Sequence, residues 1–195
     1  MVQLDTSWLQ HVQKPARYTG GEYNSIVKDH STVDVTMALA FPDVYEVAMS
    51  HLGIKILYGL VNRRDDAAAE RVFAPWHDME EEMRKRNIPL FSLETRTPIK
   101  DFDVLGFTLQ YEMSFTNILN MLDLAGIPMY AKDRDMDFPL LVCGGPCAFN
   151  VEPIADFFDI VSLGESEEWG DEFIDLYKAE KAKGFTGGKE DFLRK

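Results

Sequence analysis

The sequence has little cysteine, no long apolar run and no excess of positive charge. Only two of its 195 residues are cysteine, which gives no indication of a disulfide-stabilised secreted domain. No apolar run approaches the roughly 18 residues of a membrane-spanning helix, and the first residues lack the basic and apolar regions of a signal peptide. The net charge of −13 repels a phosphate backbone, which disfavours direct nucleic-acid binding. We therefore expect a cytoplasmic protein without membrane or nucleic-acid partners.

Two phosphate-binding motifs are also absent. No Gly-x-Gly-x-x-Gly follows the first expected strand, and no glycine-rich loop ends in lysine. The turns after the expected core strands carry no lysine or arginine either. Dinucleotide binding and P-loop nucleotide binding are therefore disfavoured. The backbone donors, hydroxyls and amide at these turns favour a small-molecule cofactor that is neutral and has polar edges.

The chain does contain an alternation of short apolar runs and helical patterns. Apolar runs bounded by turn residues are typical of strands that are buried on both faces of a parallel sheet. We expect five core strands, at residues 33–41, 70–74, 104–109, 140–143 and 160–163. The main helical patterns lie between and after them, at 45–62, 79–86, 114–125 and 167–181. This alternation predicts an α/β fold, a doubly wound parallel sheet of the flavodoxin-like or Rossmann type with strand order 2-1-3-4-5.

The two ends of the chain differ from this alternating region. Residues 1–32 lack a sustained periodicity, and we expect them to form an N-terminal arm on an α/β domain at 33–182. The polar, glycine-rich segment 183–195 is typical of a linker. We expect this linker to lead towards a further domain.

Glycine ends two consecutive core strands, with Gly144 and Gly145 after the fourth strand and Gly164 after the fifth. Because glycine has no Cβ, the backbone can turn sharply there and approach a ligand closely. In open α/β sheets, ligands bind beyond the carboxyl ends of the strands. These corners, together with Pro42 and Asp43 after the first strand, predict one wall of a binding site. Asp43 is also placed to cap the first long helix.

The two cysteines, Cys143 and Cys147, have the spacing of the first half of a four-iron cluster motif. Asn150 stands where the third cysteine of that motif belongs, and two thiolates are too few for such a cluster. We therefore expect no metal site in this chain. Cys143 is expected in the core, because free cysteine is usually buried. Cys147 follows the turn and is a candidate for the lining of the binding site.

Other chemically capable side chains leave alternatives open. His51, beside Gly53, is either a structural residue or a ligand-binding residue. Glu165 and Glu167 form either an acid–base pair or favourable charges at the start of the last helix. Ser50 beside His51 suggests hydrolysis, but no nucleophile elbow surrounds this serine. The residues alone thus indicate a binding domain without a complete catalytic site.

Several motifs together resemble a known domain. The segments 141–146 (LVCGGP), 152–153 (EP) and 159–167 (DIVSLGESE) resemble a pattern of the N-terminal cobalamin-binding-type domain of radical S-adenosylmethionine (SAM) enzymes. The segment 42–53 resembles the first loop and helix of that domain. More narrowly, residues 17–168 resemble the N-terminal region of an uncharacterised radical SAM iron–sulfur oxidoreductase family.

The resemblance implies a domain that binds cobalamin (vitamin B12) or derives from one that does. The positions that match the cofactor crevice are Pro42, Asp43, His51, Gly53, Gly144, Gly145, Pro146, Cys147, Gly164 and Glu165. The resemblance implies SAM and a 4Fe-4S cluster only for a following radical SAM barrel domain. That barrel would be this domain's partner within one polypeptide.

Two positions depart from the resemblance. Cys147 stands where relatives often have histidine. In the Asp-x-His-x-x-Gly signature of domains that ligate cobalt through histidine, Met49 replaces the aspartate and Gly53 comes one residue early. The alternative function is a degenerate, non-catalytic scaffold or docking domain that binds no cobalamin. This alternative predicts a crevice filled by a large side chain such as Phe41, Tyr111 or Phe149.

Overall fold

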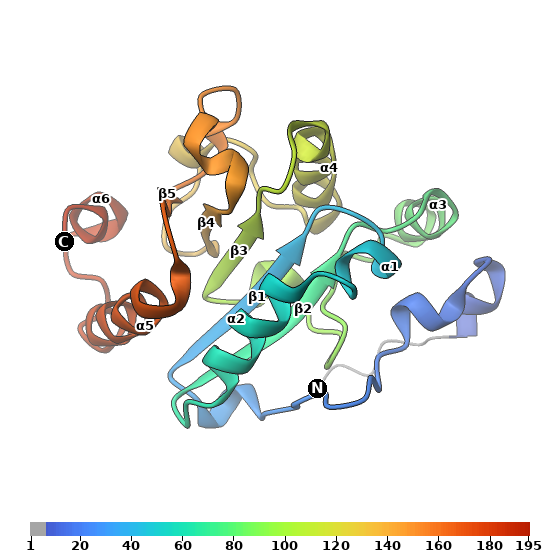
Figure 1. The fold of residues 1–195 in the computed structure, drawn as a ribbon, viewed down its shortest axis with the longest axis horizontal. Coiled ribbons are helices and arrows are strands. Elements are labelled where there is room, and N and C mark those ends of the chain that lie inside the picture. The colour runs from blue at the N-terminus through green and yellow to red at the C-terminus, as the bar shows by residue number, and fades with distance from the viewer. Residues whose placement is uncertain (1–6) are drawn as a thin grey trace.

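The computed structural model describes residues 7–195, except the side chain of Glu168. Five parallel strands form one sheet with helices on both faces (Figure 1). The strands are β1 (Val35–Phe41), β2 (Ala67–Phe73), β3 (Val104–Thr108), β4 (Leu140–Gly144) and β5 (Ile160–Val161). Their order is β2-β1-β3-β4-β5, and each neighbouring pair is parallel. The predicted fold class and strand order are confirmed.

Six α-helices are assigned in the described part of the chain. They are α1 (Tyr45–Ala48), α2 (Leu52–Asn62), α3 (His77–Arg86), α4 (Phe115–Ala125), α5 (Ser166–Ala182) and α6 (Gly188–Leu193). Short 3-10 helices lie at Ser7–His11, Pro15–Tyr18, His30–Thr32, Ile99–Asp101, Glu112–Ser114, Ala131–Asp133, Pro146–Asn150 and Ala155–Phe157. Among residues 7–195, no helix combines the length and the apolar character that a membrane crossing needs.

Alternating side chains of the strands build a separate core on each face of the sheet. In β1, Met37 and Leu39 pack towards α2 and α5, whereas Ala38 and Ala40 pack towards α3 and α4. Successive side chains of a strand point to opposite faces, so a strand covered on both sides needs an uninterrupted apolar run. All seven residues of β1 are accordingly buried.

The first long helix of the sequence prediction is in fact two helices. A turn follows α1, and His51 then begins α2 with an extended backbone and an Nδ1 atom that accepts the backbone N–H of Ile54 at 3.3 Å. The prediction that Asp43 caps the first helix is wrong. Its carboxylate accepts the N–H of Val44 and the hydroxyl of Tyr111 instead. The turn brings the His51 ring against the carboxyl end of β1, where it packs on Phe41.

Three further features lie at element boundaries or between elements. β2 begins at Ala67 rather than at residue 70, because three alanines of low strand propensity still pair in register with β1. Between α3 and β3, Phe91 and Pro98 form an isolated antiparallel bridge. Gly126 ends α4 in the left-handed conformation, with φ of 68°, which glycine adopts without strain.

Both ends of the described chain pack on the α/β domain. In the N-terminal segment, the Lys28 ammonium donates to the backbone carbonyl of Ala67 at the start of β2. At the other end, Phe192 of α6 is buried against Phe173 and Tyr177 of α5. Residues 183–195 thus contribute to the core, and their role as a link to a further domain stays a prediction.

A buried ion pair joins the N-terminal segment to β2 and to the loop that follows α3. The Arg71 Nε donates to Glu94 Oε1 at 2.6 Å, and the two side chains are only 6% and 0% exposed. The guanidinium also donates to Ser25 Oγ and lies 4.5 Å from the ring centroid of Tyr58. Burial raises the pKa of Glu94. Removing either residue would therefore leave the other charge buried without a partner.

Replacing Glu94 by glutamine is expected to lower the free energy of unfolding by about 3 kcal/mol, because the Arg71 charge then stays buried without a partner. Urea denaturation of both proteins measures the difference. The matched control is the double variant Arg71→Met with Glu94→Leu, which removes both charges and should recover most of the loss. A Glu94→Gln protein as stable as the parent would contradict the structural role of the pair.

Candidate ligand-binding cleft

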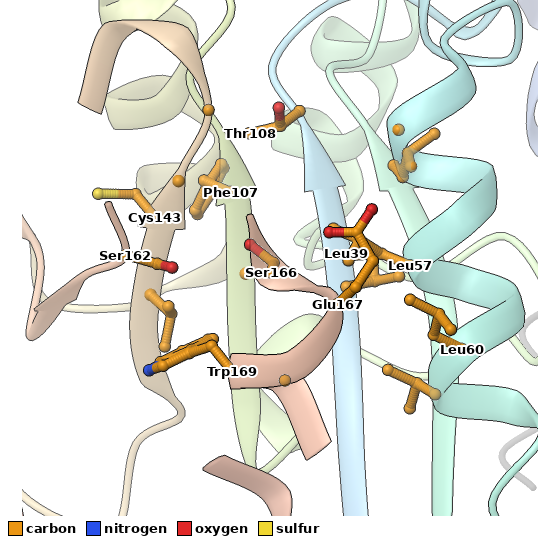
Figure 2. A pocket seen from close by; sticks show the side chains of 18 of the residues that line it. Leu39, Leu57, Leu60, Phe107, Thr108, Cys143, Ser162, Ser166, Glu167 and Trp169 are labelled. Atoms are coloured by element: carbon orange, nitrogen blue, oxygen red, sulfur yellow. The ribbon is translucent and has the colours of Figure 1, made fainter. Parts of the chain in front are cut away.

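A cleft of about 260 Å³ lies between α2, α5 and the sheet face that these helices cover (Figure 2). Figure 2 shows Leu57 and Leu60 on one side of the cleft and Trp169 on the other. The volume is slightly below the range of about 300–1,000 Å³ typical of sites that enclose a whole ligand. The cleft therefore accepts one ring system and cannot enclose a large cofactor.

The floor of the cleft is a row of three residues across the central strands. Leu39 of β1 pairs with Gly106 of β3, which pairs with Val142 of β4. Of the described atoms, a Cβ added to Gly106 would meet only the Leu39 side chain, at 3.8 Å. A glycine inside a strand weakens the sheet and often marks a close approach by a ligand. Gly106 was not among the predicted site residues, although a glycine within an apolar strand run is a signal for it.

The deeper walls of the cleft are apolar. Leu57, Leu60 and Val61 come from α2, and Trp169 and Ile174 come from α5. An apolar guest gains free energy when it leaves water for such surroundings, at about 25 cal/mol for each Å² buried. These walls therefore favour an uncharged ring.

Ion pairs between the two walls lie at the deeper end of the cleft. The Arg63 and Arg64 guanidinium groups, just after α2, bind the two carboxylate oxygens of Asp171 on α5 at 2.9 and 3.2 Å. Arg64 also pairs with Asp66 and Asp175. These arginines add no unpaired positive charge to the cleft, because carboxylates bind their guanidinium groups. They hold α2 and α5 together at one end while the other end stays open.

The mouth of the cleft, at the carboxyl ends of the strands, is polar. Its side chains offer hydroxyl, amide, imidazole and carboxylate groups, from His51, Thr108, Gln110, Ser162, Ser166 and Glu167. The N-terminus of α5 also opens here, and the first backbone N–H groups of a helix lack intrahelical partners. Glu165 precedes this helix, but its side chain makes no capping hydrogen bond. The mouth can thus bind the polar edge of a ligand whose apolar part lies deeper.

The structure brings together six of the ten predicted site residues. The six in the lining of the cleft are His51, Gly53, Gly144, Gly145, Gly164 and Glu165. Gly145 has φ of 110°, and a Cβ there would lie 2.9 Å from the backbone oxygen of Leu109. Only glycine permits this close contact between the loops after β3 and β4. The loop geometry at the mouth therefore depends on the residue type at this corner.

The other four predicted residues do not line the cleft. Pro42 and Asp43 are held by the loop and helix that follow β3, because Asn117 donates to the Pro42 carbonyl and Tyr111 to the Asp43 carboxylate. Pro146 begins a 3-10 helix. Cys147 packs in the core on the opposite face of the sheet. Their proximity to a larger cofactor above the mouth remains an expectation.

Comparison with known proteins identifies the family. A family model described as "Radical SAM proteins, N-terminal" matches residues 53–195. The chain belongs to this family. The matched part of this radical SAM N-terminal domain begins within α2 and includes the strands β3 and β4 of the cleft floor and the wall helix α5.

One relative is a much longer protein, of which only a part matches this chain. "Uncharacterized protein MJ0966" of Methanocaldococcus jannaschii is 28% identical over 134 residues, which are 67% of this chain and 24% of that protein. This radical SAM N-terminal domain therefore spans about a quarter of the length of the curated relative that it matches.

The cysteines of the domain are both buried. Cys143 is 1% exposed, and burial raises its pKa to about 12; Figure 2 shows its side chain directed away from the cleft. The pKa of Cys147 is also raised, by burial and by the nearby Glu112 carboxylate. Metal binding and nucleophilic attack both require the thiolate. Within residues 7–195, no group of three or more histidine, cysteine, aspartate or glutamate side chains is arranged to hold a metal ion.

Cys143 is expected to resist thiol reagents in the folded protein at pH 8, because a pKa near 12 leaves almost no thiolate. The Cys147→Ser variant isolates this thiol, and its reaction with a disulfide reagent can be followed by absorbance. Modification should proceed only as fast as the protein unfolds and should become rapid in denaturant. Rapid labelling without denaturant would show that Cys143 is accessible.

Proposed function

We propose that this domain binds a corrinoid such as cobalamin and forms the N-terminal part of a radical SAM enzyme. The observation that carries the proposal is the apolar cleft above Gly106, which opens at the carboxyl edge of the sheet. Open α/β sheets bind their ligands at this edge. The glycine corners at the mouth add backbone that a large flat molecule can approach closely.

The dimensions of the cleft fit one part of a corrinoid. The corrin ring with its amide side chains is too large for about 260 Å³. The nucleotide base of cobalamin is a flat, uncharged bicyclic ring, which suits the apolar walls and the open space over Gly106. The ring and its amides would then lie over the mouth, within reach of hydrogen bonds from Gln110 and Ser166.

The contacts of His51 favour a structural role for this residue. Its Nδ1 accepts the Ile54 N–H, and its ring packs on Phe41 at 5.0 Å between centroids. The sequence around it also lacks the aspartate and the glycine spacing of cobalt-ligating domains. We therefore propose that the corrinoid is bound without a cobalt ligand from His51.

The catalytic chemistry is proposed to lie in another domain of the same polypeptide. The family description names the N-terminal part of radical SAM proteins, and the M. jannaschii relative is about four times longer than the matched region. A radical SAM barrel with SAM and a 4Fe-4S cluster is the partner that fits this description. The residues of the present domain are proposed to bind and orient the cofactor for that barrel.

The scaffold alternative predicts a blocked crevice, and the structure gives no support for that blockage. Phe41 is buried beneath His51, Tyr111 bonds to Asp43, and Phe149 is 78% exposed. None of these three side chains belongs to the described lining of the cleft.

Titration of the purified chain with hydroxocobalamin is expected to shift the visible spectrum of the cofactor in a saturable way, because its surroundings change on binding. The control is the Gly145→Ala variant, whose added Cβ would lie 2.9 Å from the Leu109 backbone oxygen and disturb the mouth, so it should weaken the shift. An unchanged spectrum at high micromolar cofactor would refute corrinoid binding by this domain.

Two substitutions of His51 distinguish a helix-capping role from ligation of cobalt by its imidazole. His51→Ala should lower the free energy of unfolding by about 1 kcal/mol, whereas His51→Asn should retain most of the stability, because asparagine is a good capping residue. The visible spectrum of bound cobalamin should be the same for the parent and His51→Asn. A spectral change in that variant would show that the imidazole ligates cobalt.

A further inference from the structure

We propose that the cleft selects among corrinoids by their base, accepting a benzimidazole and rejecting a purine, and that Gly106 is the position that determines whether a base can enter. This inference rests on the proposed function and deepens it. It concerns the part of the ligand that lies below the mouth.

Among the described residues, the floor of the cleft offers no free hydrogen-bond partner, and Asp171, the charged side chain at the deeper end, is already bound by Arg63 and Arg64. The backbones of β1, β3 and β4 are paired with one another along the floor. The backbone of α2 is engaged within its own helix, and apart from Asp171 the side chains of the deeper walls are aliphatic or aromatic. A polar group placed there would lose its bonds to water without replacement.

The two kinds of base differ in this respect. Dimethylbenzimidazole presents carbon and two methyl groups at the end of the ring that enters first. Adenine presents ring nitrogens and an exocyclic amino group at the corresponding end. A buried polar group without a partner is strongly unfavourable, whereas the methyl groups gain from burial. The apolar depth therefore discriminates by chemistry between bases of similar size.

The polar groups of Thr108 and Gln110 lie towards the carboxyl end of β3 from Gly106. Gly106 lies two residues before Thr108, the last residue of β3, and a strand rises about 3.3 Å for each residue. Thr108 and Gln110 bond to each other at the mouth. A base that covers Gly106 has passed this polar region.

The depth of the cleft depends on the absence of a side chain at position 106. Leu39 and Val142 flank this position in the row across the sheet, and the nearest side chain to an added Cβ is 3.8 Å away. Alanine would therefore fit without displacing a neighbour. Valine would extend into the space that the base needs.

The test compares three corrinoids with the whole chain: cobalamin, its analogue with adenine as the base, and cobinamide, which has no base. Dissociation constants come from absorbance titration and are checked by calorimetry. Cobalamin should bind about tenfold or more tightly than the adenine analogue and more tightly than cobinamide. Equal affinity for cobalamin and cobinamide would overturn the inference but leave corrinoid binding intact. Equal or tighter binding of the adenine analogue would also overturn it, and failure of all three would refute the proposed function.

Two substitutions in the floor test the same inference. Gly106→Val should reduce the affinity for cobalamin to that for cobinamide without changing cobinamide binding. Gly106→Ala should have a smaller effect. The matched control is Gly59→Ala, because Gly59 lies on α2 outside the lining and an added Cβ there would have no atom within 4 Å. Val142→Thr keeps the side-chain shape and adds a hydroxyl, so it should narrow the preference for cobalamin over the adenine analogue. Unchanged cobalamin binding by a folded Gly106→Val protein would contradict the inference.

Discussion

The parallel pairing of β3 with β1 on one side and β4 on the other is the constraint on which the cleft depends. This pairing sets Leu39, Gly106 and Val142 side by side on one face. It also brings the loops after these strands to the same edge of the sheet. A shift of one residue in either pair would turn the opposite set of side chains towards α2 and α5. Glycine would then no longer lie beneath the opening, and Phe107 would occupy its place.

The helices α2 and α5 cover the floor residues that this register sets, and they form the walls of the cleft. Both run down the same face of the sheet (Figure 1), and Arg63 and Arg64 join them through Asp171 at the deeper end. Exposed pairs of this kind contribute little to stability one by one. Their effect on geometry is larger, because they fix one end of the space. Polar groups thus lie at both ends, and the apolar surface lies between them.

The fold could be predicted because it follows from local patterns and general rules of chain connection. Apolar runs that alternate with helical patterns give a parallel sheet, and right-handed crossovers leave few strand orders. The break before His51 could not be predicted, since apolar residues continue at helical spacing across it. The start of β2 was missed for a related reason: Ala67 and its neighbours are buried by pairing with β1, which alanine itself does not indicate.

The rim of the cleft was easier to predict from the sequence than its depth. The corners at Gly145 and Gly164 follow from the rule that ligands bind beyond strand ends, and both do line the cleft. Pro42 and Asp43 follow from the same rule, but contacts with Asn117 and Tyr111 hold them outside the lining. The floor and the walls are set by strand register and helix packing between residues far apart in the chain.

A glycine in the middle of a buried strand lowers the stability of the fold by roughly 0.5–1 kcal/mol relative to alanine. It also has no side chain against which its neighbours can pack. Gly106 carries this disadvantage in the central strand of the sheet. A protein that no longer had a guest in the cleft would gain stability by acquiring a branched side chain at this position. Under the proposed function, the residue type at the position equivalent to 106 therefore distinguishes relatives that bind a ligand in the cleft from relatives that do not.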